Sequence, residues 1–529
     1  MASKIWIKIK ENKWLLLIML LGAFLRIFYL GHESFWLDES ETVFATQKTP
    51  SYIVQNMFAK TLAPEIFGPE RGGGSMPLPY ILFYYWTKLV GMNEFNLRLL
   101  SAIFGIASIY LIYVLGKVFF NKKIGLISAF ILAINHQHIY YSQEARVYSF
   151  LVMSAMLSVY FLYKLLFLGK SYHIVFYFIS TVAMLYSHYY SIFFLIFEIV
   201  YVLFVLIYHK SNLRQALVSL LLIILAYLPW LPAFFRQISQ GAVSRIQGPL
   251  TLSKIAQTAI GINSWISLDF GTRSALVNLR LVGITISGFL TIASVLLISL
   301  IFISLFLKEI ILFIKYFKDS TSIDKGASKY LILIMWIFIP LLMLLALAVI
   351  SPETSTFGPI RYLLFLTPPY YILISKSIVN FKGIFRKLDK LGVKYIVILI
   401  VLLSTMPIYS YYTNYDKGQY REAAEYLASK VKETDLVIVH GAPTFYPFNF
   451  YYNQYPKRAL VYKSFSIEDL NKFVASRNEF WAVQSMLKHY DPKNEFLNYV
   501  DNSFVAEEKA EFIDVKVVKY KRKNLSSNK

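Results

Sequence analysis

The chain has 529 residues, of which 57% are hydrophobic and 17% aromatic, and its mean hydropathy is +0.52. This composition predicts a multi-spanning membrane protein and argues against a large soluble domain. The sequence has no cysteine, which excludes disulfides, thiolate catalysis and zinc–thiolate sites. Its net charge of +22 comes from basic residues between apolar runs and in the tail. The sequence contains no recognisable nucleic-acid-binding motif, so we expect the basic residues to face the cytoplasmic surface of a membrane.

Apolar segments long enough to span a bilayer recur along the chain. The N-terminal MASKIWIKIKENK followed by an apolar run resembles a signal peptide, but no small-residue cleavage site follows, so we expect an uncleaved first helix. We predict spans near 14–30, 99–119, 124–142, 147–168, 172–187, 189–208, 215–235, 281–307, 329–350, 360–378 and 395–412. Splitting the run 281–318 would add crossings, so the prediction is an odd number, roughly 11 to 13.

The segment 77–91, PLPYILFYYWTKLVG, is apolar but short and rich in aromatic residues. If it lies flat on the outer surface, the lysine-rich loops, such as 308–329 and 376–394, all fall on the cytoplasmic side. If it crosses, they all face outward. We therefore predict a horizontal helix, a cytoplasmic N-terminus and an extracytoplasmic C-terminus in the cell membrane.

The composition changes near Tyr415, where spacing typical of a surface helix (QYREAAEYLASKVK) precedes an apolar run of strand length (DLVIVHG). FWAVQSM and FIDVKVVKYK look like further strands. We predict a transmembrane domain over 1–412, whose first outer loop is 31–98, and a small extracytoplasmic α/β domain over 413–529. No internal repeat is visible.

The stretch SFWLDESETVFATQ (34–47) places Asp38, Glu39 and Glu41 just after the first predicted span. A carboxylate on the outer face is able to act as general base for a hydroxyl nucleophile. Taken alone, however, the stretch is more typical of a solvated loop in which Asp38 caps a helix. The acidic pair by itself therefore favours the structural interpretation.

Three arginines, Arg98, Arg146 and Arg361, fall at outer membrane boundaries in the predicted topology. Such arginines often extend to lipid headgroups without further function. Together on the face that carries Asp38 and Glu39, they fit a narrower role, because guanidinium groups bind phosphate bidentately. They could hold a lipid-linked phosphate and stabilise it as a leaving group.

The histidine pair His136/His138 and the lone His188 also lie near this boundary, and hydrogen-bonded structure is the favoured interpretation of each. The i, i+2 spacing of the pair is not that of a helical metal site, so no metal site is predicted from it. A divalent ion on the acidic residues is compatible with the sequence but not required by it. The aromatic runs fit either an interfacial belt or a sugar-binding groove.

The order of motifs resembles the GT-C membrane glycosyltransferases, specifically the glycosyltransferase family 39 group, which includes protein O-mannosyltransferases and lipid A aminoarabinose transferases. The motifs are LDES, MPLPY, LRLLSAIFG, YYSQEARVY, SHYY, RYLLFLTPP and a terminal YREAAEYL…DLVIVHG. They span most of the chain. Met76 departs from the pattern, because the family often has a histidine there, so any role of that imidazole is absent or supplied elsewhere.

The resemblance implies a GT-C-type polytopic helical fold and transfer of a sugar from a polyprenyl-phosphate or polyprenyl-diphosphate donor to a lipid, glycan or protein hydroxyl. It makes Asp38 the catalytic base, with Glu39 as its neighbour near the acceptor. It implies that Arg98, Arg146 and Arg361 bind the donor phosphate or hold the first outer loop. Nearby Tyr148, His188 and Tyr362 are predicted to contact substrate.

Two other classes of function remain open from the residues. A transporter or flippase of envelope lipids or glycans would favour paired charges near the bilayer midplane, broken helices and repeats. Only Arg26 is expected inside a span, but the prolines of AYLPWLPAF and FLTPPYY could break helices. A non-catalytic scaffold would tolerate changes at Asp38.

Overall fold

The computed structural model describes residues 2–59, 76–208, 213–239, 297, 300–314, 325–350, 360–380, 389–415, 417–440, 442–455, 460–464, 467–485, 491 and 493–523. The chain divides into two compact units. The first comprises Met1–Leu30, Gly74–Gly91 and Phe95–Asn414, and the second comprises Gly31–Gly73, Met92–Glu94 and Tyr415–Lys529. The segment with the acidic residues therefore belongs to the same unit as the C-terminal part of the chain.

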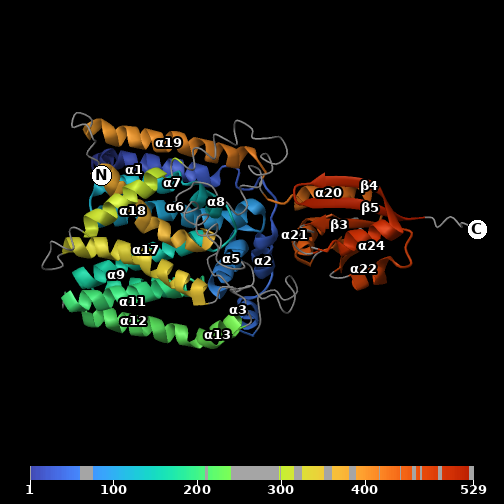
Figure 1. Cartoon of the computed structure of the whole chain (residues 1–529), viewed down its shortest axis with the longest axis horizontal. Helices are drawn as coiled ribbons and strands as arrows, with labels where there is room; N and C mark the ends of the chain where they lie inside the picture. The colour runs from blue at the N-terminus through green and yellow to red at the C-terminus, as the bar shows by residue number, and fades with distance from the viewer. Residues whose placement is uncertain are drawn as a thin grey trace, which may run out of the picture. The chain divides into compact units, whose positions relative to one another are not determined.

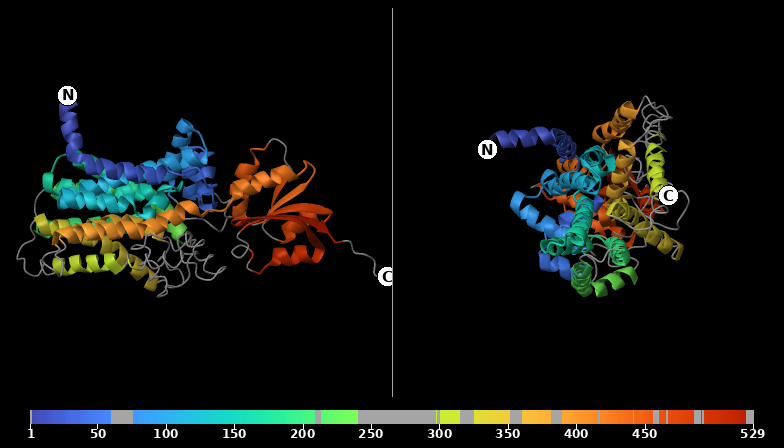
Figure 2. Two further views of the ribbon diagram at one scale, coloured as in Figure 1. Left: turned by 90° about the horizontal axis from the view of Figure 1, so that it is seen from above. Right: turned by 90° about the vertical axis from the view of Figure 1, so that its left-hand side faces the viewer.

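The first unit is a bundle of helices, most of which run side by side (Figures 1 and 2). They are α1 (Ala2–Ile27), α5 (Pro77–Val90), α6 (Glu94–Phe119), α7 (Lys122–Ala133), α8 (His136–Ser142), α9 (Tyr148–Leu168), α10 (Tyr172–Leu185), α11 (Ser191–Tyr208), α12 (Leu213–Tyr227), α13 (Leu231–Ser239), α17 (Lys325–Ile350), α18 (Thr367–Val379) and α19 (Asp389–Thr413). Two 3₁₀ turns, η1 (Leu228–Trp230) and η3 (Ile360–Leu366), precede α13 and α18.

Six helices in the described part of the chain are long and apolar enough to cross a membrane, namely Glu94–Phe119, Tyr148–Leu168, Arg214–Gln237, Ser328–Ile350, Arg361–Val379 and Val393–Thr413. Two shorter apolar helices are Tyr172–Leu185 and Ser191–Val205. The chain is a multi-pass membrane protein with a mostly helical fold, as predicted. Residues 300–314 are also helical, but most of the predicted span 281–307 lies outside the described residues. The total number of crossings stays a prediction.

Helix α5 corresponds to the short segment 77–91. It begins with Pro77 at its first position, where the missing N–H costs nothing, and ends at Val90, followed by the C-cap Gly91, whose φ of 81° suits glycine. At 14 residues it is about 21 Å long, shorter than the roughly 30 Å hydrocarbon core. A segment of this length fits the predicted horizontal helix, while the sidedness of the termini stays a prediction.

The prediction of a single span over 124–142 is wrong, because this segment forms α7 and α8 with a break between them. Asn135 caps α8, since its side chain accepts a hydrogen bond from the backbone N–H of His138 at 2.8 Å. The last two carbonyls of α7 each accept a hydrogen bond from Arg26 at 2.9 Å. These contacts satisfy the backbone groups that a continuous helix would have paired internally.

The expectation that Arg26 is the only charged side chain within a span overlooked Glu198 on α11. Glu198 is fully buried, and its carboxyl oxygens accept hydrogen bonds from the hydroxyls of Ser158 at 2.5 Å and Tyr177 at 3.2 Å. These donors come from α9 and α10, so the carboxyl group links three helices. Interhelical hydrogen bonds of this kind make a buried polar group tolerable in an apolar bundle.

The second unit contains two short helices, α2 (Leu37–Thr46) and α3 (Pro50–Ala59), and an α/β domain. Its elements are α20 (Tyr420–Lys430), β1 (Leu436–His440), α21 (Ala442–Tyr452), β2 (Leu460–Ser464), α22 (Ile467–Val474), β3 (Glu479–Ser485), α24 (Glu495–Ser503), β4 (Phe504–Phe512) and β5 (Val515–Arg522). The strand order is β2-β1-β3-β5-β4. β1 is parallel to β2 and β3, whereas β5 is antiparallel to β3 and β4.

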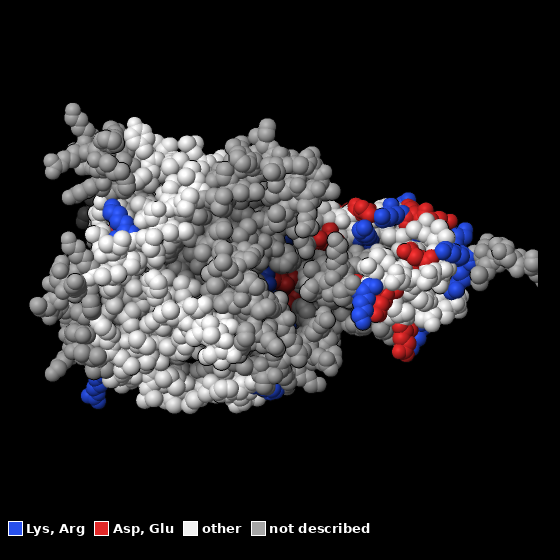
Figure 3. All heavy atoms as spheres, viewed as in Figure 1, with Lys and Arg blue, Asp and Glu red and all other residues white. Residues whose placement is uncertain are grey.

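The predicted α/β character of the C-terminal part is confirmed, and strands β1, β3 and β5 lie where the sequence placed them. β4 was not foreseen, because its sequence FVAEEKAEF is dominated by charged and exposed positions. An apolar core that includes Ile438, Phe480 and Phe496 packs between the sheet and its helices. On the face shown in Figure 3, charged side chains cover this domain, whereas the described surface of the first unit is almost free of them. An uncharged surface is what a bilayer requires of the helices that it surrounds.

Candidate active site

The acidic residues lie on the first turn of α2. The helix begins at Leu37, and its N-cap is Trp36, which has extended backbone and makes no side-chain capping bond. The prediction that Asp38 caps a helix is therefore wrong by two positions. Asp38 and Glu39 occupy the first turn instead, where the helix dipole favours negative charge.

The three carboxylates of this segment differ in burial. Glu39 has no exposed surface and Glu41 has 6%, whereas Asp38 is only partly buried. The interpretation of this stretch as a solvated loop is thus wrong for two of the three acidic residues. Asp38 lies on the first turn of a helix and keeps part of its surface exposed, and a general base must be within reach of its reactant.

The first unit contains a group of side chains that we call the arginine–aromatic cluster, made up of Arg146, Tyr148, His188, Tyr190, Arg361 and Tyr362. They come from the bend between α8 and α9, the first residue of α9, the turn between α10 and α11, and η3. Tyr362 is at the centre, with its ring centroid 5.0 Å from that of His188, 5.4 Å from Tyr190 and 6.2 Å from Tyr148. The guanidinium carbon of Arg361 lies 5.3 Å from the same ring centroid.

The cluster is positively charged but its histidine is neutral. Desolvation, and then the charges of Arg146 and Arg361, lower the pKa of His188 to about 3. The backbone N–H of Tyr190 donates a hydrogen bond to Nδ1 of His188 at 3.2 Å, which leaves Nε2 to carry the ring proton. The two arginines, and not the histidine, therefore supply the charge with which this cluster attracts an anion.

The lowered pKa of His188 makes a prediction about stability. Because the folded-state pKa lies below that of the unfolded chain, stability is full above about pH 6.5 and decreases as the pH falls towards 3. The limiting slope is about 1.4 kcal/mol per pH unit, and partial exposure of the ring reduces it. We expect the melting temperature of purified protein to fall more steeply between pH 7 and 5 than that of His188→Gln. Equal slopes would contradict this account.

Arg146 has further contacts that fix its position. Its Nη1 donates a hydrogen bond to the hydroxyl of Tyr80 on α5 at 3.2 Å, and its carbonyl accepts one from Ser101 on α6 at 3.1 Å. Tyr80 belongs to the MPLPY motif, so this motif contributes a tyrosine to the site. Met76 is buried at the N-cap of α5. Tyr80 and Tyr190 were not predicted to belong to the site, although they lie in the MPLPY and SHYY motifs.

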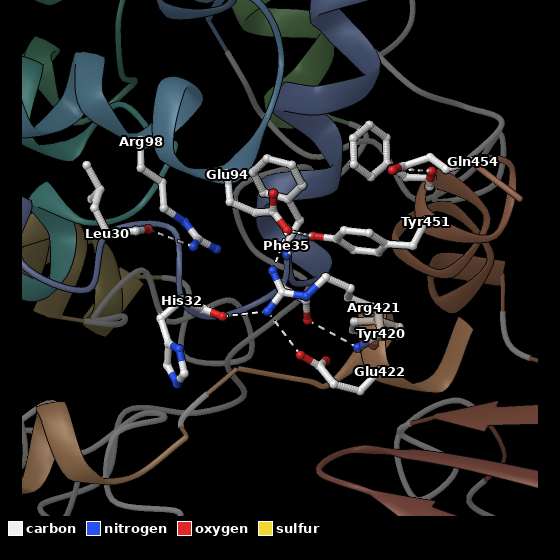
Figure 4. A network of polar contacts seen from close by, with 12 residues as sticks. Leu30, His32, Phe35, Glu94, Arg98, Tyr420, Arg421, Glu422, Tyr451 and Gln454 are labelled. Atoms are coloured by element: carbon white, nitrogen blue, oxygen red, sulfur yellow. Dashed lines mark hydrogen bonds and ion pairs between the residues drawn. The ribbon is translucent and has the colours of Figure 1, made fainter. Parts of the chain in front are cut away.

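Arg98 is held differently. It is almost fully buried, and its Nη1 donates a hydrogen bond to the carbonyl of Leu30 at 3.0 Å, as Figure 4 shows. Leu30 lies just after α1, at the end of the first span. This contact fits the second of the two roles expected for Arg98, holding the start of the first outer loop. No described residues form a group of three or more His, Cys, Asp or Glu side chains that could hold a metal ion.

The structure thus brings together five of the predicted site residues, Arg146, Tyr148, His188, Arg361 and Tyr362, in the first unit. Asp38 and Glu39 share the second unit. The catalytic and binding roles of these seven residues stay predictions.

Comparison with solved structures identifies the architecture. ArnT from Cupriavidus metallidurans in the apo state superposes with a TM-score of 0.53 at 12% identity, covering 96% of this chain and 98% of that one. The chain has the GT-C fold. The same enzyme bound to undecaprenyl phosphate gives a TM-score of 0.52 at 13% identity, with the same coverage of both chains. The apo oligosaccharyltransferase of Archaeoglobus fulgidus gives 0.53 at 14% identity, covering 91% of this chain and 70% of that one.

The GT-C fold agrees with a comparison at the level of sequence. Residues 75–233 match the family model for dolichyl-phosphate-mannose-protein mannosyltransferase. This range runs from α5 into α13 and includes Arg98, Arg146, Tyr148 and His188. A search of curated proteins finds no match. The resemblance inferred from the order of motifs is confirmed at the level of the GT-C fold.

Proposed function

We propose that this GT-C protein is a membrane glycosyltransferase that moves a sugar from a polyprenyl-phosphate-linked donor to a hydroxyl acceptor on the extracytoplasmic face of the cell membrane. The observation that carries the proposal is the arginine–aromatic cluster. The charges of its two guanidinium groups both lower the pKa of the same histidine, His188, which lies among tyrosine rings. Much of the cluster falls in the range that matches the mannosyltransferase model, and the GT-C fold is shared with a structure that holds undecaprenyl phosphate.

On the donor side, Arg146 and Arg361 bind the phosphate that links the lipid to the sugar. As the glycosidic C–O bond breaks, negative charge grows on that phosphate, and fixed guanidinium groups stabilise it without reorganisation. Tyr148 and Tyr362 offer ring faces and edges against which a sugar could stack, and neutral His188 offers an N–H donor. These groups make the phosphate a good leaving group and hold the sugar in one orientation.

On the acceptor side, Asp38 accepts the proton of the hydroxyl group as its oxygen attacks the anomeric carbon. The new C–O bond forms as the bond to the phosphate breaks, and the polyprenyl phosphate leaves from the opposite face of the sugar. The configuration at the anomeric carbon is therefore inverted. A divalent ion is not required by this scheme, because the arginines provide the positive charge.

The transporter or flippase alternative is less well supported. Its expected signature is a pair of opposite charges near the bilayer midplane. Two charged residues buried among the described helices have separate partners instead: Arg26 donates to backbone carbonyls and lies 3.0 Å from Nδ1 of His138, whereas Glu198 accepts from hydroxyl groups. A largely buried pair of opposite charges does occur, because Nζ of Lys376 lies 3.2 Å from Glu309, but Lys376 is in the last turn of α18, at a helix end. Contacts of this kind hold helices together without a substrate.

The proposal is tested by reconstituting the purified protein with polyprenyl-phosphate-linked sugars in nanodiscs and supplying candidate acceptors. We expect free polyprenyl phosphate to be released in step with glycosylated acceptor, and added polyprenyl phosphate to inhibit the reaction as a product. In liposomes, a flippase would move the intact lipid between leaflets without cleaving it. Transbilayer movement with no release of polyprenyl phosphate from any donor would overturn the proposal.

A further inference from the structure

Within the second unit, the chain just before α2 is hydrogen-bonded to the C-terminal domain at several points. The backbone N–H of Ser34 donates to the hydroxyl of Tyr415 at 2.8 Å, and the Ser34 hydroxyl donates to the carbonyl of Gly418 at 2.5 Å. The same hydroxyl oxygen accepts from the backbone N–H of Tyr420 at 3.1 Å. Ser34 has no exposed surface, so these bonds are shielded from water. The entry to α2 is therefore fixed to the connection that leads into α20.

A second set of contacts holds the same region through Arg421 of α20 (Figure 4). One nitrogen of Arg421 donates to the carboxylate of Glu94 at 2.8 Å, and the other to the carbonyl of His32 at 2.5 Å. Tyr451 on α21 completes the network, since its hydroxyl donates to Glu94 at 2.9 Å and accepts from the backbone N–H of Phe35 at 2.6 Å. The two ends of the first outer loop are thereby hydrogen-bonded to one domain.

The third contact reaches α2 itself. Nζ of Lys417 lies 3.5 Å from Oε2 of Glu39, and the side chains are 4% and 0% exposed. A buried carboxylate is costly unless a partner compensates its charge. Lys417 provides a compensating positive charge from the connection between α19 and α20, and removing one member of a buried ion pair is costly. The ion pair therefore resists rotation of the first turn of α2.

Fixing Glu39 also fixes the direction of its neighbour. Successive residues of an α-helix are about 100° apart around the axis. With Glu39 on the buried side, Asp38 must project about 100° away, and it is the residue of the two that retains exposure. A small rotation of the turn would move the Asp38 carboxylate, and general-base catalysis is sensitive to displacements of about 1 Å.

We infer that the C-terminal domain is a positioning element for the base, and that Lys417, through its ion pair with Glu39, is a positioning residue for Asp38. Glu39 then holds the helix and does not touch the substrate. This inference rests on the proposed function for its catalytic readout, but the fixation of α2 is measurable without catalysis.

The test compares Lys417→Met, which removes the charge, with Lys417→Arg, which retains it. We expect Lys417→Met to lower kcat about 10- to 100-fold, with the Kd for undecaprenyl phosphate changed less than about twofold, because the donor site has different residues. Lys417→Arg should restore most of the activity. The matched control is Lys516→Met in the same domain, since Lys516 pairs with Glu511 at 3.1 Å but both side chains are about half exposed. This control should retain the kcat of the wild type.

A variant that lacks only the lysine could fail to fold, because the buried Glu39 would lose the cationic partner that Lys417 provides. The double variant Glu39→Gln/Lys417→Met removes both charges and should fold. We expect it to keep the low kcat, because a neutral pair lacks the attraction that fixes the turn. Activity of the double variant equal to that of the wild type would overturn the inference. A second outcome would also overturn the inference: the single variant Glu39→Gln is inactive while the single variant Lys417→Met is fully active. Glu39 would then act directly on the reactants.

Hydrogen exchange separates failure of this inference from failure of the proposed function. In Lys417→Met, amides of α2 should exchange faster than in the wild type, while those of β1 and β3 stay unchanged. If the wild type transfers no sugar, the proposed function fails and the exchange rates alone decide the role of Lys417. Unchanged exchange in α2 would overturn the inference whatever the activity.

Discussion

Asp38→Asn is expected to lower kcat for sugar transfer by about 10²- to 10⁴-fold, the range that a positioned general base contributes. The amide has the shape of the carboxylate but cannot accept the proton of the acceptor hydroxyl. Asp38 lies on the first turn of α2 and is partly exposed, so the change should not disturb a buried charge. The measurement is single-turnover transfer from a radiolabelled lipid-linked sugar, with the Kd for polyprenyl phosphate determined in parallel.

The matched control is Glu33→Gln, an acid-to-amide change in the same unit, outside α2. It should leave kcat within about twofold of the wild type, because Glu33 is only partly buried and lies before the first turn of α2. A transferase with full activity in Asp38→Asn would remove Asp38 as the base. If Glu33→Gln were as inactive as Asp38→Asn, the loss of activity in both variants would reflect the negative charge of this segment and not a base at residue 38.

Arg361→Ala is expected to raise the Kd for polyprenyl phosphate by about 10- to 150-fold, because hydrogen bonds to charged groups contribute about 1.5–3 kcal/mol. Arg361 is 8% exposed, and its guanidinium carbon lies 5.3 Å from the ring centroid of Tyr362, so its charge is shielded from solvent. Arg361→Lys should recover part of the affinity, since an ammonium group keeps the charge but loses the planar pair of donors. Binding is measured by calorimetry or by competition with a labelled lipid.

The control for this change is Arg214→Ala, which removes the same charge from an exposed position on α12. It should bind polyprenyl phosphate as the wild type does. Arg361→Ala with unchanged donor affinity would take Arg361 out of the phosphate site, and equal losses in both variants would point to a general effect of charge at the membrane surface.

The sequence predicted those features of the fold that depend on local pattern. Long apolar runs yielded the helices, and alternating or continuous apolar stretches yielded β1, β3 and β5. It failed where a tertiary contact decides the local structure. The break between α7 and α8 depends on Arg26, whose bonds to that helix end join residues separated by 106 and 107 positions.

The same distinction applies to the candidate site. Arg146, Tyr148, His188, Arg361 and Tyr362 were all named from motifs, and the structure places them together in turns, in η3 and at the start of α9. The burial of Glu39 could not be predicted, since its partner Lys417 is 378 residues away and lies in a connection with no recognised motif. Sequence patterns identified residue types suited to the chemistry. The ion pair of Glu39 with Lys417 could be recognised only from the folded chain.

The bonds of Arg26 to the end of α7 have a consequence for the assembly of the protein in the membrane. When the first helix leaves the ribosome, the partners of its arginine on α7 have not been made, because those carbonyls lie more than 100 residues later in the chain; only the Gly22 carbonyl of the same helix is in place. Until then the guanidinium group needs water or lipid phosphates, which hold it near the membrane surface. We therefore expect the first helix to reach its final depth only after α7 has been inserted. We consequently expect the packing of α1 in this bundle to be completed only when the later helix α7 is present.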